Sequence, residues 1–203
     1  MKIVLATRNH KKTEEIRRIL AGSGVELLNL TAFPEAPEVV EDGITFAENA
    51  AKKAVQIAQF TGLTALADDS GLVVDPLDGA PGVLSARYAG PDADDAANLA
   101  KLQQAVRPIP LAQRTARFEC VMTLACPDGR LHHFPGSVAG LIIDEPRGGN
   151  GFGYDPVFVP VGYDQTFAEM AGEQKDSISH RGRALAALSA ALHASGGKIV
   201  SCD

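Results

Sequence analysis

Two adjacent carboxylates, Asp68 and Asp69, follow a short apolar segment and precede Ser70 and Gly71. Magnesium on a polyphosphate needs only one or two protein carboxylates, because waters and phosphate oxygens complete its octahedron. A carboxylate at this point could therefore hold such a metal or accept a proton from an attacking water. An acidic turn whose side chains cap backbone N–H groups would use the same residues, and in isolation that interpretation is favoured.

Two clusters of cations and hydrogen-bonding side chains stand where helices are expected to begin. The first is Thr7-Arg8-Asn9-His10-Lys11-Lys12, and the second contains Lys175, Ser179, His180 and Arg181. A helix N-terminus offers backbone N–H groups and the positive end of a dipole, which suit a phosphate. The first cluster is not a Walker loop, because it lacks the glycines and the Gly-Lys-Ser/Thr ending. Each cluster alone is also typical of a helix cap followed by solvated cations.

A glycine-rich loop, 148–156, carries Phe152, Gly153, Tyr154 and Asp155. Its glycines permit unusual backbone angles and the close approach of a ligand. An aromatic ring beside such a loop can stack on a base, and Asp155 can accept a hydrogen bond from the donor edge of that base. A simple connector would also be rich in glycine, but two embedded aromatic rings are less expected of one. Together with the acidic pair and the cationic helix starts, this loop indicates a nucleoside triphosphate site.

The composition excludes several other classes of protein. The 203 residues include 19 Lys and Arg against 25 Asp and Glu, a formal net charge of -6, with no Trp. This balance argues against a protein that grips long nucleic acid through a basic face. No apolar run approaches the roughly 20 residues that span a bilayer, and the N-terminus lacks the pattern of a signal peptide. Cys120, Cys126 and Cys202 show no metal-ligand spacing, so a reducing compartment, most simply the cytoplasm, is expected.

The elements that must carry these residues alternate between strands and helices. Strands are expected at 2–6, 25–30, 64–67, 115–126, 131–143 and 157–159, and helices at 11–20, 45–61, 94–106 and 179–195. Thr45 and Glu48 form a capping box that starts the second helix. Residues 75–92, rich in Gly and Pro, are expected to form a long functional loop. The order predicts an α/β fold with a central mixed sheet and two lobes around a cleft.

Six motifs occur in order, with compatible spacing, over nearly the whole chain. They are Ala6-Thr7-Arg8-Asn9 with Lys12 and Glu15, Thr45-Phe46-x-Glu48-Asn49-Ala50, Ala67-Asp68-Asp69-Ser70-Gly71-Leu72, Gly79-Ala80-Pro81-Gly82-Val83 with Ser85-Ala86-Arg87-Tyr88, Phe152-Gly153-Tyr154-Asp155-Pro156, and Ser179-His180-Arg181-x-x-Ala184-Leu185. With these motifs the sequence strongly resembles the Ham1-like (inosine triphosphate pyrophosphatase) family and its bacterial dITP/XTP pyrophosphatases. Six linked motifs are far more specific than any one of them.

The resemblance implies one elongated, two-lobed α/β domain over residues 1–203, usually a homodimer, with helices flanking the sheet and the active site in the cleft between the lobes. It implies Mg²⁺-dependent hydrolysis of dITP, ITP and XTP to the monophosphate and pyrophosphate, which keeps these nucleotides out of DNA and RNA. It also implies that Asp69 is the proton acceptor and a metal ligand, with Glu41 as the second ligand. The substrate contacts that it implies are Thr7, Arg8, Asn9, His10, Lys11, Lys12, Ser70, Phe152, Gly153, Tyr154, Asp155, Lys175, His180 and Arg181.

One position departs from the family, and two other functions stay open. Many relatives have Gly in the Thr-Gly-Asn turn where this chain has Arg8, which can alter the phosphate contacts of the loop. A Maf-like nucleotide pyrophosphatase would prefer other bases, but the segments 152–155 and 179–181 favour the Ham1-like alternative. A nucleotide sensor without turnover would keep the binding residues, but the acidic pair and the lysines disfavour it. No nucleic acid or membrane partner is expected.

Overall fold

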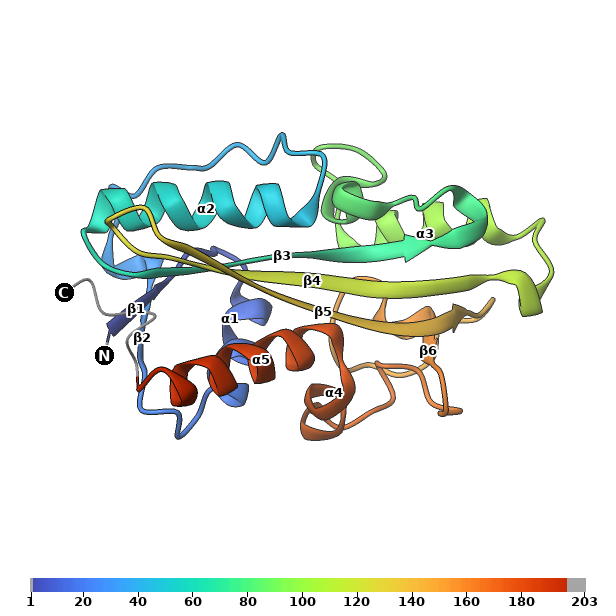
Figure 1. Cartoon of the computed structure of the whole chain (residues 1–203). Coiled ribbons are helices and arrows are strands. Elements are labelled where there is room, and N and C mark those ends of the chain that lie inside the picture. The colour runs from blue at the N-terminus through green and yellow to red at the C-terminus, as the bar shows by residue number, and fades with distance from the viewer. Residues whose placement is uncertain (1, 197–203) are drawn as a thin grey trace. The chain divides into compact units, whose positions relative to one another are not determined.

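The structure, a computed structural model, describes residues 2–196 and contains one mixed sheet with the strand order β2-β1-β3-β4-β5-β6 (Figure 1). β1 pairs in parallel with both β2 and β3, whereas β5 and β6 are antiparallel. The strands are β1 (Lys2–Leu5), β2 (Glu26–Asn29), β3 (Ala65–Val74), β4 (Thr115–Ala125), β5 (Leu131–Ile142) and β6 (Phe158–Pro160). The helices are α1 (His10–Ile19), α2 (Phe46–Thr61), α3 (Asp95–Val106), α4 (Gly172–Ile178) and α5 (His180–Ala194). The predicted α/β class with a mixed sheet is confirmed.

Backbone contacts divide the chain into two compact units. The first contains the residues up to Asp69, Cys120–Gly136 and the residues from Arg181 on, and the second contains Ser70–Glu119 and Ser137–His180. The boundaries fall inside β3, β4 and β5, so each of these strands contributes residues to both units. The first unit contains two buried apolar clusters, one on each face of its strands, and the second unit contains one.

In the first unit the sheet is covered on both faces. Successive strand side chains point to opposite faces, so Ile3 and Leu5 of β1 pack with α1 and α5, whereas Val4 packs with α2. Figure 1 shows α2 on one side of these strands and α1 and α5 on the other. In β4 the alternating Cys120, Met122 and Leu124 lie in the cluster with α1 and α5. The two helical layers therefore enclose both faces of the strands that carry the acidic pair.

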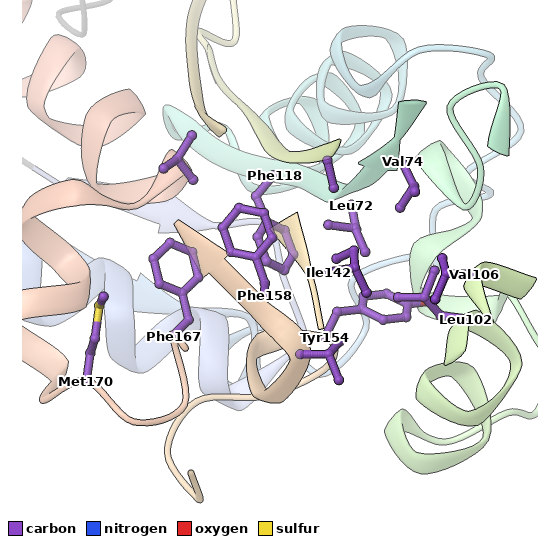
Figure 2. Close-up of a cluster of buried hydrophobic side chains, with 13 residues drawn as sticks. Leu72, Val74, Leu102, Val106, Phe118, Ile142, Tyr154, Phe158, Phe167 and Met170 are labelled. Carbon is purple, nitrogen blue, oxygen red and sulfur yellow. The ribbon is translucent and has the colours of Figure 1, made fainter. Parts of the chain in front are cut away.

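The second unit has an aromatic core (Figure 2). The ring of Phe118 lies 4.8 Å from that of Phe158 and 5.8 Å from that of Phe167, measured between centroids. Leu102 and Val106 of α3 belong to the same cluster. Residues 75–92, predicted as a loop, contain two short 3-10 helices, Asp75–Leu77 and Gly82–Arg87.

Helix starts follow the capping residues in the sequence. Thr45 caps α2 by accepting a hydrogen bond from the backbone N–H of Glu48, and Glu48 accepts one from the N–H of Ile44. Asp94 caps α3 in the same way, through the N–H of Ala97. None of the helices in the described part of the chain has the length and apolar character to cross a membrane. Cys120 and Cys126 are buried free thiols, and Cys202 lies outside the described residues.

Two boundaries expected from the sequence are wrong. The strand expected to end at Ala67 continues to Val74, so segment 68–71 lies inside β3 rather than at its end or in a turn. The carboxylates of Asp68 and Asp69 are tolerated in this buried strand because cationic side chains from helices form ion pairs with them. Lys175, expected at the start of the final helix, lies in the separate short helix α4, which ends before Ser179.

Candidate active site

The acidic pair is divided between the two faces of β3. Because strand side chains alternate, Asp68 shares a face with Leu66, which packs with α1 and α5, and Asp69 shares the opposite face with Ala67, which packs with α2. Both carboxylates are buried, with residue exposures of 1% and 6%. Adjacent residues with the same side-chain chemistry therefore have different surroundings.

Asp68 is surrounded by cations. Lys12 donates to its Oδ1, the Arg181 Nε donates to its Oδ2 at 3.0 Å, and the Cys120 thiol donates to Oδ2 at 3.2 Å. Arg181 also pairs through Nη1 with Glu15 of α1. Burial opposes ionisation of Asp68, but Arg181 and Lys12 outweigh it and hold the pKa of this carboxyl well below its usual range. Asp68 is therefore a fixed anion that orients Lys12 and Arg181.

Asp69 has fewer partners. Lys53 of α2 donates to Asp69 Oδ1 and to Glu41 Oε2, each at 3.1 Å, and thereby links the two carboxylates. Burial raises the pKa of Asp69 to about 6, and the attraction of Lys53 and Lys12 only partly offsets it. The second oxygen, Oδ2, is buried and accepts no hydrogen bond from the described residues. A carboxyl with a raised pKa and an unused oxygen has the properties expected of a general base or a metal ligand.

The donor set beside Lys53 fits a magnesium ion. Asp69 Oδ2 is an unused hard oxygen, and Glu41 supplies a second carboxylate on the same lysine. Within residues 2–196 no group of three or more His, Cys, Asp or Glu side chains could enclose a metal. Magnesium does not require one, because it keeps several waters and takes further oxygens from a phosphate substrate.

The turn before α1 is an ordered cap. Asn9 accepts a hydrogen bond through Oδ1 from the N–H of Lys12, and Thr7 Oγ1 accepts one from the N–H of Asn9, both at 3.1 Å. Arg8 donates from Nη2 to the backbone oxygen of Ala36 at 2.9 Å. Lys11 and His10 are exposed on the first turn, where His10 lies 3.3 Å from Glu14. Of the six residues proposed for this turn, Lys12 reaches the acidic pair, at Asp68.

In the second unit, Asp155 organises the glycine-rich loop. Its Oδ2 accepts a hydrogen bond from the N–H of Phe152 at 2.9 Å and another from Lys175 Nζ at 2.7 Å, and both charged side chains are buried. Gly151 has a φ of +74°, and a Cβ built on it would lie 2.0 Å from that same oxygen. Lys175 also lies 5.2 Å from the centre of the Phe152 ring. Lys175 and Phe152 are thus brought together by one carboxylate.

The remaining predicted residues of this unit are held by neighbouring groups. Tyr154 is buried in the aromatic core, and its hydroxyl donates to the backbone oxygen of Ser85 at 2.8 Å (Figure 2). His180 is buried and stacks on Phe118 with ring centroids 4.8 Å apart. Ser70, the first residue of the unit, is half-buried. Tyr154 therefore anchors the loop in the buried core, whereas Phe152 is half-buried.

A pocket of about 200 Å³ adjoins the loop. It is lined by Asp95, Ala96 and Leu99 of α3 and by Gly149–Gly153 and Pro156 of the loop. Asp95 accepts a hydrogen bond from the N–H of Gly153 at 3.1 Å, next to Phe152. This bond ties the loop to the first turn of α3.

Three residues with clear roles in these contacts were missed by the site prediction. Lys53, Glu15 and Asp95 make the contacts described above with Asp69, Arg181 and Gly153. Lys53 follows Phe46, Asn49 and Ala50 on the buried face of α2, and the signal that could have identified it was a lysine on a mostly apolar helical face. Glu15 stands in the first motif, but its partner is 166 residues away and no local pattern predicts it.

The sequence and the fold of this chain are similar to those of known proteins. The model of the Ham1 family matches residues 3–191. A dITP/XTP pyrophosphatase of Desulforamulus reducens is 54% identical, over 91% of this chain and 92% of that protein, and one of Geobacter sulfurreducens is 54% identical, over 92% and 94%. A HAM1 protein from Coxiella burnetii superposes with a TM-score of 0.88 at 42% identity, covering 96% of this chain and 99% of the other.

Proposed function

The chain belongs to the Ham1 family, and we propose that it is a pyrophosphatase for non-standard purine nucleoside triphosphates, namely dITP, ITP and XTP. The relatives that are about half identical over nine-tenths of the chain support this substrate class. The observation in the structure that carries the proposal is the group formed by Asp69, Lys53 and Glu41, with a buried carboxylate oxygen of Asp69 that no group within residues 2–196 satisfies.

The bond broken is the anhydride between the α- and β-phosphates. A water attacks the α-phosphorus, and pyrophosphate leaves from it. Asp69 orients this water through Oδ2 and accepts its proton, for which a pKa near 6 is suited at neutral pH. The oxygen of the water ends on the nucleoside monophosphate. Lys53 keeps Asp69 in place through Oδ1 and leaves Oδ2 available to the metal and to the water.

The cations of the first unit offset the charge that develops on the phosphates. Asp68 holds Lys12 and Arg181 in fixed positions, so they need no reorganisation during the reaction. Magnesium, held by Asp69 and Glu41, would neutralise phosphate oxygens and help to orient the water. Thr7 and the residues Asn9–Lys12 of the turn before α1 are the proposed contacts for the triphosphate.

Recognition of the base is assigned to the second unit. Phe152 offers a ring for stacking, and Lys175 and His180 offer donors that suit the 6-oxo group of hypoxanthine or xanthine. Asp155 acts by positioning, because its Oδ2 is engaged by Phe152 and Lys175. We further propose that the whole chain functions as one domain, as a homodimer in the cytoplasm.

Product analysis tests the proposed function. ITP, XTP, dITP, ATP and GTP are compared side by side with Mg²⁺ in water enriched in ¹⁸O. The expected result is pyrophosphate release from the first three nucleotides, with ¹⁸O in the nucleoside monophosphate. Equal hydrolysis of ATP and GTP would contradict the substrate class. Release of inorganic phosphate, or ¹⁸O in pyrophosphate, would contradict the bond.

A further inference from the structure

Arg8 joins two segments of the first unit that are separate in sequence. Its Nη2 donates to the backbone oxygen of Ala36, 28 residues further along, at 2.9 Å. Ala36 is buried and lies in the same apolar cluster as Ala6, two residues before Arg8. The Arg8 side chain is therefore held at its backbone, in the turn before α1, and at its guanidinium, by the carbonyl of a buried residue. Arg8 therefore connects the turn before α1 to the start of the segment that carries Glu41.

Segment 36–41 has few hydrogen bonds between its two ends. Residues 37–40 form no hydrogen bond with any described part of the chain. The segment is held again at Glu41, by Lys53, and at Gly43, whose N–H donates to Asn49 Oδ1 at 2.8 Å. At its start the segment is held by two hydrogen bonds at Ala36. The N–H of Ala36 donates to the oxygen of Phe33, and Arg8 donates to the oxygen of Ala36. Before Glu41 the segment is thus anchored at Ala36, whereas after Glu41 it is anchored by the pair of Asp42 with Lys52 and by the bond of Gly43 to Asn49.

We propose that Arg8 is a positioning residue that fixes segment 36–41, so that Glu41 stands where it can share a metal with Asp69. This inference rests on the proposed function for the role of the metal, although the anchoring itself does not. Arg8 acts through the backbone of Ala36 and Glu41 and does not serve as a phosphate ligand. Loss of a hydrogen bond from a charged donor shifts the equilibrium between the anchored and the open segment by roughly tenfold or somewhat more. This shift sets the expected size of the effect of replacing Arg8.

Amide hydrogen exchange in the nucleotide-free and metal-free full chain tests the anchoring. Arg8→Gln is compared with Arg17→Gln, a matched control, because Arg17 of α1 also donates to a distant backbone oxygen, that of Leu27, at 3.1 Å. We expect exchange of the two hydrogen-bonded amides at the ends of the segment, those of Ala36 and Gly43, to accelerate about tenfold in Arg8→Gln, and not in Arg17→Gln. Arg8→Lys, which keeps a cationic donor, should recover part of the protection. Unchanged exchange in Arg8→Gln would overturn the proposal.

Steady-state kinetics separate anchoring from phosphate contact. Arg8→Gln should raise the Mg²⁺ concentration for half-maximal ITP hydrolysis by about three- to tenfold, since Glu41 is less well placed, and leave the KM for ITP at saturating Mg²⁺ within about twofold. A higher KM for ITP with normal Mg²⁺ dependence would show a direct phosphate contact and overturn the proposal. If the unaltered chain hydrolyses no nucleotide, the proposed function fails, and the exchange experiment still decides whether Arg8 anchors the segment.

Discussion

Asp68 and Asp69 are consecutive in the sequence, and they lie on opposite faces of β3 with opposite shifts in pKa. Asp68 contacts Arg181 and Lys12, which lower its pKa against the effect of burial. For Asp69, burial prevails over the attraction of Lys53, and its pKa is raised. The alternation of a β-strand is enough to produce this division, since it directs each carboxylate to a different helical layer. One residue orients cations, and the other is available to take a proton.

Asp68→Asn is expected to destabilise the fold. It removes the carboxylate that Arg181, 1% exposed, and Lys12 share, and it leaves Arg181 with Glu15 as its charged partner. Breaking a buried ion pair by removing one partner costs about 3–5 kcal/mol of unfolding free energy. Urea unfolding of the purified variant measures it. A loss below about 1 kcal/mol, the size typical of surface pairs, would show that the network adds little stability.

The stability of the metal-free protein should depend on the protonation of Asp69. Its folded pKa of about 6 lies above the ordinary value of 3.8, so the folded state binds this proton more tightly than the unfolded chain does. The stability from this group is fully present below about pH 3.8 and is lost as the pH rises through about 6. In EDTA, the unfolding free energy of the parent minus that of Asp69→Asn should fall by up to roughly 3 kcal/mol over this range. A difference that is independent of pH would contradict the shift.

Lys53→Met is expected to raise the pKa of Asp69 further. The substitution removes the cation that Asp69 and Glu41 share and leaves the repulsion between the two carboxylates. Carboxyl ¹³C shifts followed over pH in metal-free protein measure this pKa directly. Lys52→Met is the matched control on the same helix, since Lys52 forms an exposed pair with Asp42. An equal effect of the two substitutions, or a lower pKa in Lys53→Met, would exclude the proposed role of Lys53.

Gly151→Ala is expected to disrupt the loop that presents Phe152. The φ of +74° disfavours alanine, and the new Cβ would stand 2.0 Å from the Asp155 oxygen that binds Phe152 N–H and Lys175. We expect a loss of about 1–3 kcal/mol in stability and a KM for ITP raised at least about tenfold. Gly149→Ala is the control, because a Cβ at Gly149 meets no atom within 4 Å. A normal KM in Gly151→Ala would contradict the role of Asp155 as the organiser of this loop.

Local patterns in the sequence predicted much of the fold. The capping box at Thr45 and Glu48 fixed the start of α2, because both partners lie within one turn. The full length of β3 was not predicted, because an acidic pair followed by Ser70 and Gly71 is locally typical of a turn. The strand continues because Lys12, Lys53 and Arg181, from three different helices, pair with its two carboxylates. No window of the sequence contains that information.

Local sequence patterns predict only part of the candidate site as well. Residue types and motifs identified Asp69, Lys12 and Arg181 as candidates, but their pairings depend on tertiary structure. Arg181 was predicted as a substrate contact, and the structure places its guanidinium between Asp68 and Glu15. Lys53 was missed, because a lysine on a helix is usually solvated, and its burial follows from the packing of α2 on β3. The assignments of individual residues to substrate and metal remain predictions.

The most direct test of the central claim is the turnover of ITP by Asp69→Asn at saturating Mg²⁺, with thermal unfolding measured on the same sample. Asparagine keeps the shape of the side chain and removes its ability to accept a proton. We predict a kcat lower by about two to four orders of magnitude, together with a fold at least as stable at neutral pH as that of the parent. A near-normal kcat from a folded Asp69→Asn would contradict the account, because another group would then have to activate the water.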